Sequence, residues 1–405
     1  MPLADWLFMR IDAVDFFYLS MPEVTLEADG SQDALLVRIA AGGYIGWGEC
    51  EASPLTSIAA FVTPRSHGVC QPVSASILGE RLDSPEDVRR ISALVQRNSM
   101  DLLQAAHTMS GIEMAMWDVV GKLRGVPAWK LLGYSASYDK TPYASMLFGA
   151  TPDETIAAVR GAVARGFRAV KVGWGGFGAG SAEADADQLA AAREGLGADG
   201  ILLVDAGQIW VEDTVAALER LDALERADVT WLEEPFLADS FAAYGEFTSK
   251  SRKVRVAGGE GAHNSRMALN LIEHGGIGFV QIDCGRIGGL GPAKVVADHA
   301  VARGITYVNH TFTSHLALSA SLQPFAGLEG HRICEYPVAP KQLAIDMTAN
   351  SLQPDQNGSV RAPDAPGLGI EVDTKAIAKY LVDVKIEVGG SLLFDSSAKL
   401  QLSGH

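Results

Sequence analysis

Between residues 201 and 310, five short apolar runs each end on an ionisable side chain. The residues that end these runs are Asp205, Glu233, Glu260, Asp283 and His310. Subtraction of their residue numbers gives successive spacings of 28, 27, 23 and 27 residues. One strand, one helix and two short loops fill a spacing of this length, so the period predicts repeated βα units with an ionisable group at each strand end.

The segments between these runs carry apolar residues at helical spacing, as in residues 211–225 and 292–303. Two earlier strands, ending near Leu147 and at Lys171, and a later strand ending near Glu335 bring the number of predicted strands to eight. Eight βα units close a parallel barrel, whose chemistry lies at the C-terminal ends of the strands. We therefore predict an α/β fold built on a TIM-like barrel.

The first third of the chain lacks this repeat. Apolar and polar residues alternate over residues 16–27 and 34–40, which predicts antiparallel strands, and residues 51–73 have the composition of a loop. Helices are predicted from Ser84 and over residues 102–123. We expect an N-terminal α+β capping domain, a barrel domain and a C-terminal segment that returns to the capping domain, over residues 1–135, 136–340 and 341–405.

Composition limits the classes of function. The chain has 405 residues, 48% of them hydrophobic and 20% charged, which is typical of a globular protein with a sizeable core. A formal charge of −16 argues against a nucleic-acid partner. We find neither an apolar run of the ~18 residues that a membrane span needs nor a secretory leader. The four cysteines lack metal-ligand spacing, so we expect reduced thiols and a cytoplasmic protein.

Three of the strand-end residues are carboxylates on consecutive units: Asp205, Glu233 and Glu260. A parallel barrel brings such residues together on one face. Magnesium takes oxygen ligands in an octahedron that water and substrate complete, so the three side chains predict a magnesium site. An acidic residue at a strand end can also cap the following helix. That alternative suits any one of them taken singly, whereas the shared period favours a common site.

These residues together resemble the enolase superfamily and, within it, the mandelate racemase subgroup. The resemblance extends over nearly the whole chain. Its motifs are Gly46-Trp-Gly-Glu49, Ile112–Asp118, Lys171, Trp231-Leu-Glu-Glu-Pro235, Asp283 with Gly288-Gly289, His310 and Pro363–Gly369. The resemblance implies a modified (β/α)7β barrel and one Mg²⁺ per subunit, held by Asp205, Glu233 and Glu260. It also implies a homo-oligomer, because related enzymes are commonly dimers or octamers.

The resemblance assigns catalytic roles to four further residues. His310 is the candidate general base, and Asp283 on the preceding strand would accept its other N–H and fix its tautomer. Lys171 corresponds to the lysine that binds the substrate carboxylate. Glu335 corresponds to a carboxylic acid that donates a hydrogen bond to that carboxylate. Glu234, next to a ligand, is expected to point to the opposite face of its strand.

One position departs from the subgroup's pattern. Many members carry Lys-x-Lys on the second strand, with the second lysine as a base opposite the histidine, whereas here Gly173 follows Lys171 by two residues. Alternate residues share a strand face, so we expect a gap where that amine would lie. Racemisation needs a proton acceptor and a donor on opposite faces, so this glycine argues against a racemase. A single base suits dehydration, in which His310 takes the α-proton and then protonates the leaving β-hydroxyl.

Sugar acids are the usual substrates of such relatives. We therefore expect a Mg²⁺-dependent dehydratase that converts an aldonate or aldarate, through a metal-stabilised enediolate, to a 2-keto-3-deoxy acid. Residues 20–33 and 51–73 resemble the mobile capping loops that set specificity. Trp174, Gln208 and Asn309 are candidate contacts to substrate hydroxyls.

Three alternatives stay open on the sequence. A lactone cycloisomerase, or an epimerase with Lys171 as second base, would use the same enolisation chemistry. A non-catalytic relative would keep the fold and the metal and bind or sense a ligand. A phosphate-binding barrel of another kind would use Gly288-Gly289 as part of a phosphate loop, although no basic cluster accompanies that pair.

Overall fold

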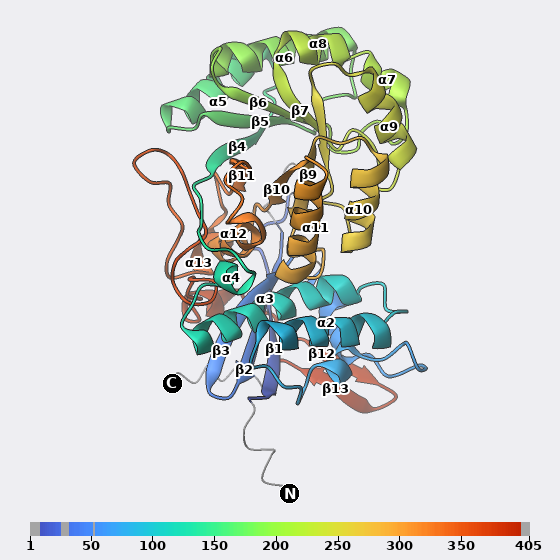
Figure 1. The fold of residues 1–405 in the computed structure, drawn as a ribbon, viewed down its shortest axis with the longest axis vertical. Helices are drawn as coiled ribbons and strands as arrows, with labels where there is room; N and C mark the ends of the chain where they lie inside the picture. Colours follow the sequence, from blue (N-terminus) through green and yellow to red (C-terminus); the bar gives the residue numbers. More distant parts are fainter. Residues whose placement is uncertain (1–8, 26–31, 52, 398–405) are drawn as a thin grey trace, which may run out of the picture.

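The computed structural model describes residues 9–25, 32–51 and 53–397. It has a barrel of parallel strands at one end and a cap of antiparallel strands and helices at the other (Figure 1). The C-terminal segment descends beside the barrel and finishes on the cap, close to the first strands of the chain.

The barrel sheet contains eight parallel strands in the order β10-β9-β8-β7-β6-β5-β4-β11. Their bounds are β4 (Thr141–Leu147), β5 (Ala169–Gly173), β6 (Ile201–Asp205), β7 (Val229–Glu233), β8 (Arg255–Gly258), β9 (Phe279–Asp283), β10 (Thr306–His310) and β11 (Ile333–Tyr336). Register pairs Asp205 with Glu233 and Asp283 with His310, so the ionisable strand ends lie level. The predicted eight-stranded barrel is confirmed.

Helices cover the outside of the barrel (Figure 1). Their bounds are α5 (Pro152–Ala164), α6 (Ala182–Leu196), α7 (Thr214–Leu218), α8 (Leu221–Arg226), α9 (Phe241–Lys250), α10 (Ser265–His274), α11 (Leu290–Ala302) and α12 (His315–Leu322), with a 3-10 turn η3 (Gln323–Phe325) after the last. The side chain of Thr151 caps α5 by accepting the N–H of Glu154. The single helix predicted over 211–225 is two helices, and the buried guanidinium of Arg220 at their junction binds Asp185 and the carbonyl of Gly180.

An apolar layer fills the barrel directly beneath the strand-end residues. Leu203, Trp231 and Val308 each lie two residues before an ionisable strand end, so both side chains of each pair point inward. Trp231 packs against Tyr143 and Phe279, with ring centroids 5.8 and 4.9 Å apart. This layer supports the polar residues above it and excludes water from below.

The two end strands of the sheet, β10 and β11, meet through a side chain. Asn309 is fully buried, and its Oδ1 accepts the backbone N–H of Glu335 at 3.0 Å. Its Nδ2 donates to the carbonyl of Glu335 at 3.2 Å and to Ser321 Oγ at 2.9 Å. The amide thus supplies the pair of hydrogen bonds that a backbone ladder would make, and it helps to close the barrel.

The cap combines a three-stranded antiparallel sheet with helices. Its elements are β1 (Ile11–Leu19), β2 (Ala34–Ala41), β3 (Tyr44–Cys50), α1 (Pro54–Val62), η2 (Val73–Ser76), α2 (Pro85–Asn98), α3 (Ala105–Arg124) and α4 (Ala128–Leu131). The first strand ends at Leu19, earlier than predicted. The predicted loop over 51–73 contains α1, which buries Ile58 and Phe61 and has a proline in its first turn, where a missing N–H costs nothing.

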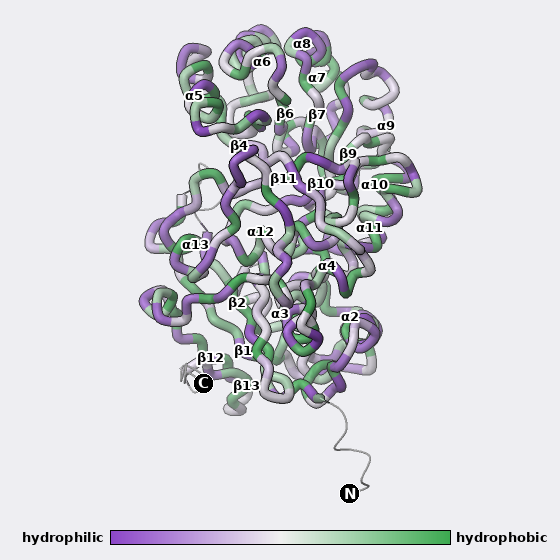
Figure 2. Tube along the Cα trace, turned by 60° about the vertical axis from the view of Figure 1, so that its left-hand side comes forward, coloured by the Kyte–Doolittle hydropathy of each residue, from purple (hydrophilic) through white to green (hydrophobic). Residues whose placement is uncertain are grey.

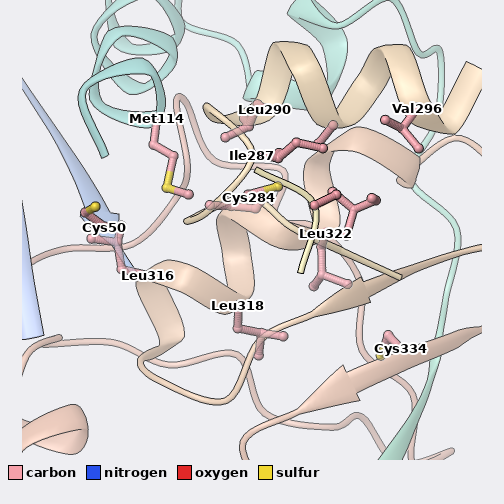
Figure 3. Packing of buried hydrophobic residues seen from close by; sticks show 14 of the residues in the cluster. Cys50, Met114, Cys284, Ile287, Leu290, Val296, Leu316, Leu318, Leu322 and Cys334 are labelled. Carbon is pink, nitrogen blue, oxygen red and sulfur yellow. The ribbon is translucent and has the colours of Figure 1, made fainter. Parts of the chain in front are cut away.

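Apolar side chains join the cap to the barrel. In Figure 3, Met114 of α3 and Cys50 of β3 lie beside Leu316 of α12, and Cys284 and further apolar residues of the barrel lie to their right. These side chains are buried to 3% exposure or less. The two parts therefore share one continuous apolar core.

The C-terminal segment comprises α13 (Gln342–Asp346), η4 (Ala376–Tyr380), β12 (Lys385–Val388) and β13 (Ser391–Asp395). It bonds to the first strand of the cap: Val382 N–H donates to the carbonyl of Tyr18 at 2.9 Å, and Ser20 N–H to that of Tyr380 at 2.8 Å. The domain boundaries stay a prediction.

Polar and apolar stretches alternate along the chain in Figure 2. Within the described residues, no helix has the length and apolar character needed to cross a membrane.

Candidate active site

A buried lysine lies at the centre of the strand-end carboxylates. Lys171 Nζ is 2.6 Å from Glu233 Oε1 and 3.2 Å from both Asp205 Oδ2 and Glu335 Oε1. Burial lowers the pKa of Lys171, but the carboxylates, Glu233 and Glu335 first, outweigh it and raise the pKa well above its usual value. The ammonium is therefore charged, and it is oriented toward the three carboxylates of Asp205, Glu233 and Glu335.

His310 and Asp283 form the predicted pair. His310 Nδ1 is 2.6 Å from Asp283 Oδ2, and Nε2 on the other side of the ring is 3.2 Å from Glu260 Oε2. Asp283 is fixed in turn, because its Oδ1 accepts the N–H of Gly285. Burial lowers the pKa of His310, but Glu260, Glu335 and the bond to Asp283 raise it well above its usual value. Asp283 thus orients the ring with Nε2 directed toward Glu260.

The three predicted metal ligands lie around this centre. Asp205 and Glu233 end β6 and β7 and share the ammonium of Lys171, whereas Glu260 follows β8 and contacts His310 and Arg286. Among the described residues, no three His, Cys, Asp or Glu side chains are already arranged as a set of metal ligands. Cations of the protein occupy the carboxylate oxygens instead.

The chemistry of these carboxylates fits a hard divalent cation. Burial raises the pKa of Asp205, and repulsion from Glu260 raises it further. Burial also raises the pKa of Glu233, and there the further repulsion comes from Asp205. For Glu260, burial is outweighed by His310 and Arg286, which lower its pKa to about 2. A divalent cation would offset the repulsion, and oxygen is the donor that Mg²⁺ prefers.

A cleft of about 320 Å³ opens above the carboxylates. Its lining includes Lys171, Trp174, Phe177, Asp205, Gln208, Ile209, Glu234, Glu260 and His310. Trp174 and Gln208, two of the expected substrate contacts, thus line it, and Gln208 Nε2 donates to Glu234 Oε2 at 2.6 Å. The third, Asn309, does not fit that role, because its amide is fully buried and bonded to Glu335 and Ser321.

Two expectations about strand faces were wrong. Glu234 lines the cleft, because β7 ends at Glu233 and a φ of +37° at Glu234 breaks the alternation. Burial and repulsion from Glu260 raise the pKa of Glu234 to about 7. Gly173 leaves no gap either: at its φ of +154°, a Cβ atom would lie 1.9 Å from the carbonyl oxygen of Asp205. The backbone of β6 fills the position where a second lysine would begin.

The glycine pair after β9, Gly288 and Gly289, lies against helix α3 of the cap. Gly288 N–H donates to Ser110 Oγ at 2.8 Å, and the first N–H groups of α11, at Leu290 and Gly291, donate to Glu113 at 2.6 and 2.9 Å. Helix N-termini attract anions, and here a carboxylate of the protein already occupies that position. The alternative of a phosphate loop is therefore wrong.

Several residues near the site were missed from the sequence. Arg286 and Glu51 form an ion pair beside Glu260, and Glu49 accepts a short hydrogen bond from Ser314 Oγ at the start of α12. Arg286 follows Asp283 closely, so its place in a strand-end loop was a usable signal. The sequence gives no signal for the pairing of Arg286 with Glu51 across the two domains, because Glu51 precedes Arg286 by 235 residues.

Comparison with known proteins identifies the family. A family model described as "Enolase C-terminal domain-like" matches residues 154–376. A second, described as "Mandelate racemase / muconate lactonizing enzyme, N-terminal domain", matches residues 20–133. The chain belongs to the enolase superfamily. It is a mandelate racemase-like member, so the suspected resemblance is confirmed.

Curated relatives in this superfamily catalyse more than one reaction. A D-galactarolactone cycloisomerase of Agrobacterium fabrum is 28% identical over 355 residues, 84% of this chain and 88% of the relative. An L-talarate/galactarate dehydratase of Salmonella typhimurium is 30% identical over 313 residues, 75% of this chain and 73% of the relative. A solved structure described as a predicted mandelate racemase from Rhodobacter sphaeroides is 65% identical with a TM-score of 0.93, covering 96% of this chain and 99% of that one.

Proposed function

We propose that this protein is a Mg²⁺-dependent dehydratase that converts a sugar acid, an aldonate or aldarate, to a 2-keto-3-deoxy acid. The observation that carries the proposal is the single oriented base: His310 lines the cleft, and its Nδ1 atom lies 2.6 Å from Asp283 Oδ2. Across the site, the backbone of Asp205 occupies the space beside Gly173 where a second base would start. Similarity to sugar-acid dehydratases also supports the proposal.

The side chains supply the steps of such an elimination. Lys171 would bind the substrate carboxylate, with Glu335, 3.2 Å from the Lys171 ammonium, as its proposed hydrogen-bond partner. Mg²⁺ held by Asp205, Glu233 and Glu260 would offset the charge that develops on the substrate oxygens.

Opening of the contact between Glu260 and His310 Nε2 would lower the pKa of His310, so that the neutral ring can take the α-proton. Asp283 then stabilises the resulting imidazolium. The imidazolium returns the proton as the β C–O bond breaks, so that water leaves. The enol then tautomerises to the keto acid.

A cycloisomerase is the second candidate. The observation that favours it is the similarity to a D-galactarolactone cycloisomerase along 84% of this chain. Both reactions begin with removal of an α-proton, but cycloisomerisation gives an isomer and loses no water. An epimerase would need Lys171 as a base, against which stand its three carboxylate contacts. A non-catalytic relative would have no use for the oriented pair of His310 and Asp283.

The test is a panel of aldonic and aldaric acids incubated with the protein and Mg²⁺ and assayed for keto acids. We expect one or a few acids to give a 2-keto-3-deoxy acid at rates that saturate with substrate. A soluble, folded protein that forms no keto acid from any of them, but yields an isomer, would replace the dehydratase with the second candidate. The homo-oligomer and the cytoplasmic location stay predictions.

A further inference from the structure

Arg286 lies between a carboxylate of the cap and a carboxylate of the barrel. Its Nε and Nη2 atoms bind Glu51 Oε2 and Oε1 at 2.6 and 3.0 Å, a two-pronged pairing of guanidinium and carboxylate. Its Nη1 atom is 3.1 Å from Glu260 Oε1. Glu51 directly follows β3, and Arg286 lies in the loop after β9. One guanidinium therefore connects the cap to a proposed metal ligand.

Glu260 is shared between two cationic partners. Its Oε1 atom receives Arg286, and its Oε2 atom lies 3.2 Å from His310 Nε2. A cation of the protein and a metal ion compete for the same carboxylate oxygens, because each contact uses lone pairs and reduces the negative charge left for the other. The strength with which Arg286 holds Glu260 must then affect the binding of a metal ion.

Glu51 is held in a fixed position relative to Arg286. Its backbone N–H donates to the carbonyl of Gly285 at 3.3 Å, beside Arg286 in sequence. Its Oε1 atom also accepts from Gln32 Nε2 at 3.3 Å. The side chains of Glu51 and Arg286 are 10% and 21% exposed, so solvent screens their charges only in part. The charges of both residues therefore act on Glu260 at short range and with little screening.

We propose that Glu51 is a positioning residue that draws the Arg286 guanidinium toward the cap and so leaves Glu260 available to a divalent cation. With all three groups ionised, Glu51, Arg286 and Glu260 carry one net negative charge. Loss of the charge of Glu51 leaves zero, whereas loss of the charge of Arg286 leaves two negative charges. The inference rests on the proposed function in one respect, that Asp205, Glu233 and Glu260 bind Mg²⁺.

The test is calorimetric titration of Mg²⁺ into EDTA-treated protein at pH 8, without substrate. We expect Glu51→Gln to weaken Mg²⁺ binding about fivefold and Arg286→Gln to tighten it by a similar factor, as one charge at short range would. The double variant should bind within about twofold of the wild type, since its net charge is restored. Weakening in both single variants would indicate a merely structural role and overturn the proposal, as would no change in either.

Glu80→Gln serves as a matched control. Glu80 pairs with Arg90 in the cap. This variant therefore loses the same charge outside the group of Glu51, Arg286 and Glu260, and it should bind Mg²⁺ like the wild type. Thermal unfolding without Mg²⁺ verifies that each variant is folded. A wild type that fails to bind Mg²⁺ overturns the metal site and this inference with it. A wild type that binds, with single variants that do not change in opposite directions, overturns this inference alone.

Discussion

The carboxylate of Glu113, in α3 of the cap, accepts the backbone N–H of Leu290 at 2.6 Å, where α11 of the barrel begins. Its Oε1 atom also accepts from Gly291 at 2.9 Å and from the indole of Trp117 at 2.7 Å. A Cβ atom on Gly289 would lie 2.1 Å from this carboxylate, so only glycine allows the approach. A side chain of the capping domain thus satisfies the N-terminal N–H groups of a barrel helix. This contact stabilises the junction beside the loop that follows Asp283.

The burial of Glu113 at this junction makes the stability of the protein depend on pH. Burial raises the pKa of Glu113 from 4.5 to about 7, so between these values the folded protein keeps a proton that the unfolded chain has released. The stabilisation that Glu113 contributes is fully present below its pKa in the unfolded chain. It is lost as pH rises through the pKa of Glu113 in the folded protein. Relative to Glu113→Gln, the wild type should lose roughly 2–3 kcal/mol between pH 5 and pH 8. Urea unfolding measures this, and parallel pH profiles would contradict it.

His310→Asn should abolish turnover. Removal of the general base is expected to lower kcat by about 10³-fold or more. Mg²⁺ should bind at least as tightly as in the wild type, because a cationic neighbour of Glu260 is lost. Steady-state kinetics with the active sugar acid and calorimetry measure the two effects. His299→Asn, at an exposed pair with Glu273, is the control and should keep full activity. Retained turnover in His310→Asn would remove this residue from the role of base.

Gly173 should tolerate no side chain. At a φ of +154°, with the carbonyl of Asp205 in the place of a Cβ atom, Gly173→Ala should cost roughly 2 kcal/mol or more of stability. Gly173→Lys should be still less stable and should not gain epimerase activity. Thermal unfolding and proton exchange at the substrate α-carbon measure both outcomes. A folded Gly173→Lys protein that exchanges the α-proton on both faces would show that the strand can accept a second base.

Asn309 is expected to contribute to the free energy of unfolding and not to substrate binding. Asn309→Ala leaves the N–H and carbonyl of Glu335 without their partner in a buried place, which is expected to cost roughly 2–4 kcal/mol. Urea unfolding and kcat/KM are the two measurements. Unchanged stability together with a large rise in KM would restore the sequence-based interpretation of Asn309 as a substrate contact.

The period of the strand ends was enough to predict the barrel and the place of its polar residues. It works because one βα unit has a nearly constant length and a parallel barrel collects its strand ends on one face. Lys171, Asp205, Glu233, Glu260, and the pair of Asp283 and His310 therefore meet as expected. Their roles in metal binding and catalysis rest on the resemblance and stay predictions.

What the period could not predict depends on contacts between distant parts of the chain or on local backbone angles. Glu51 and Glu113 belong to the cap, and nothing in the strand period indicates that they contact Arg286 and Leu290. Strand alternation fails at Glu234 because its φ is positive. A glycine at position 173 looked like a missing side chain, whereas the neighbouring strand occupies its space.

The most direct test of a single-base dehydration is proton NMR in D₂O with the Mg²⁺-loaded wild-type protein and an active sugar acid. Single-base dehydration predicts a growing 2-keto-3-deoxy acid signal, with the remaining substrate keeping its configuration at the α-carbon. Accumulation of the α-deuterated epimer, with no water lost, would contradict it.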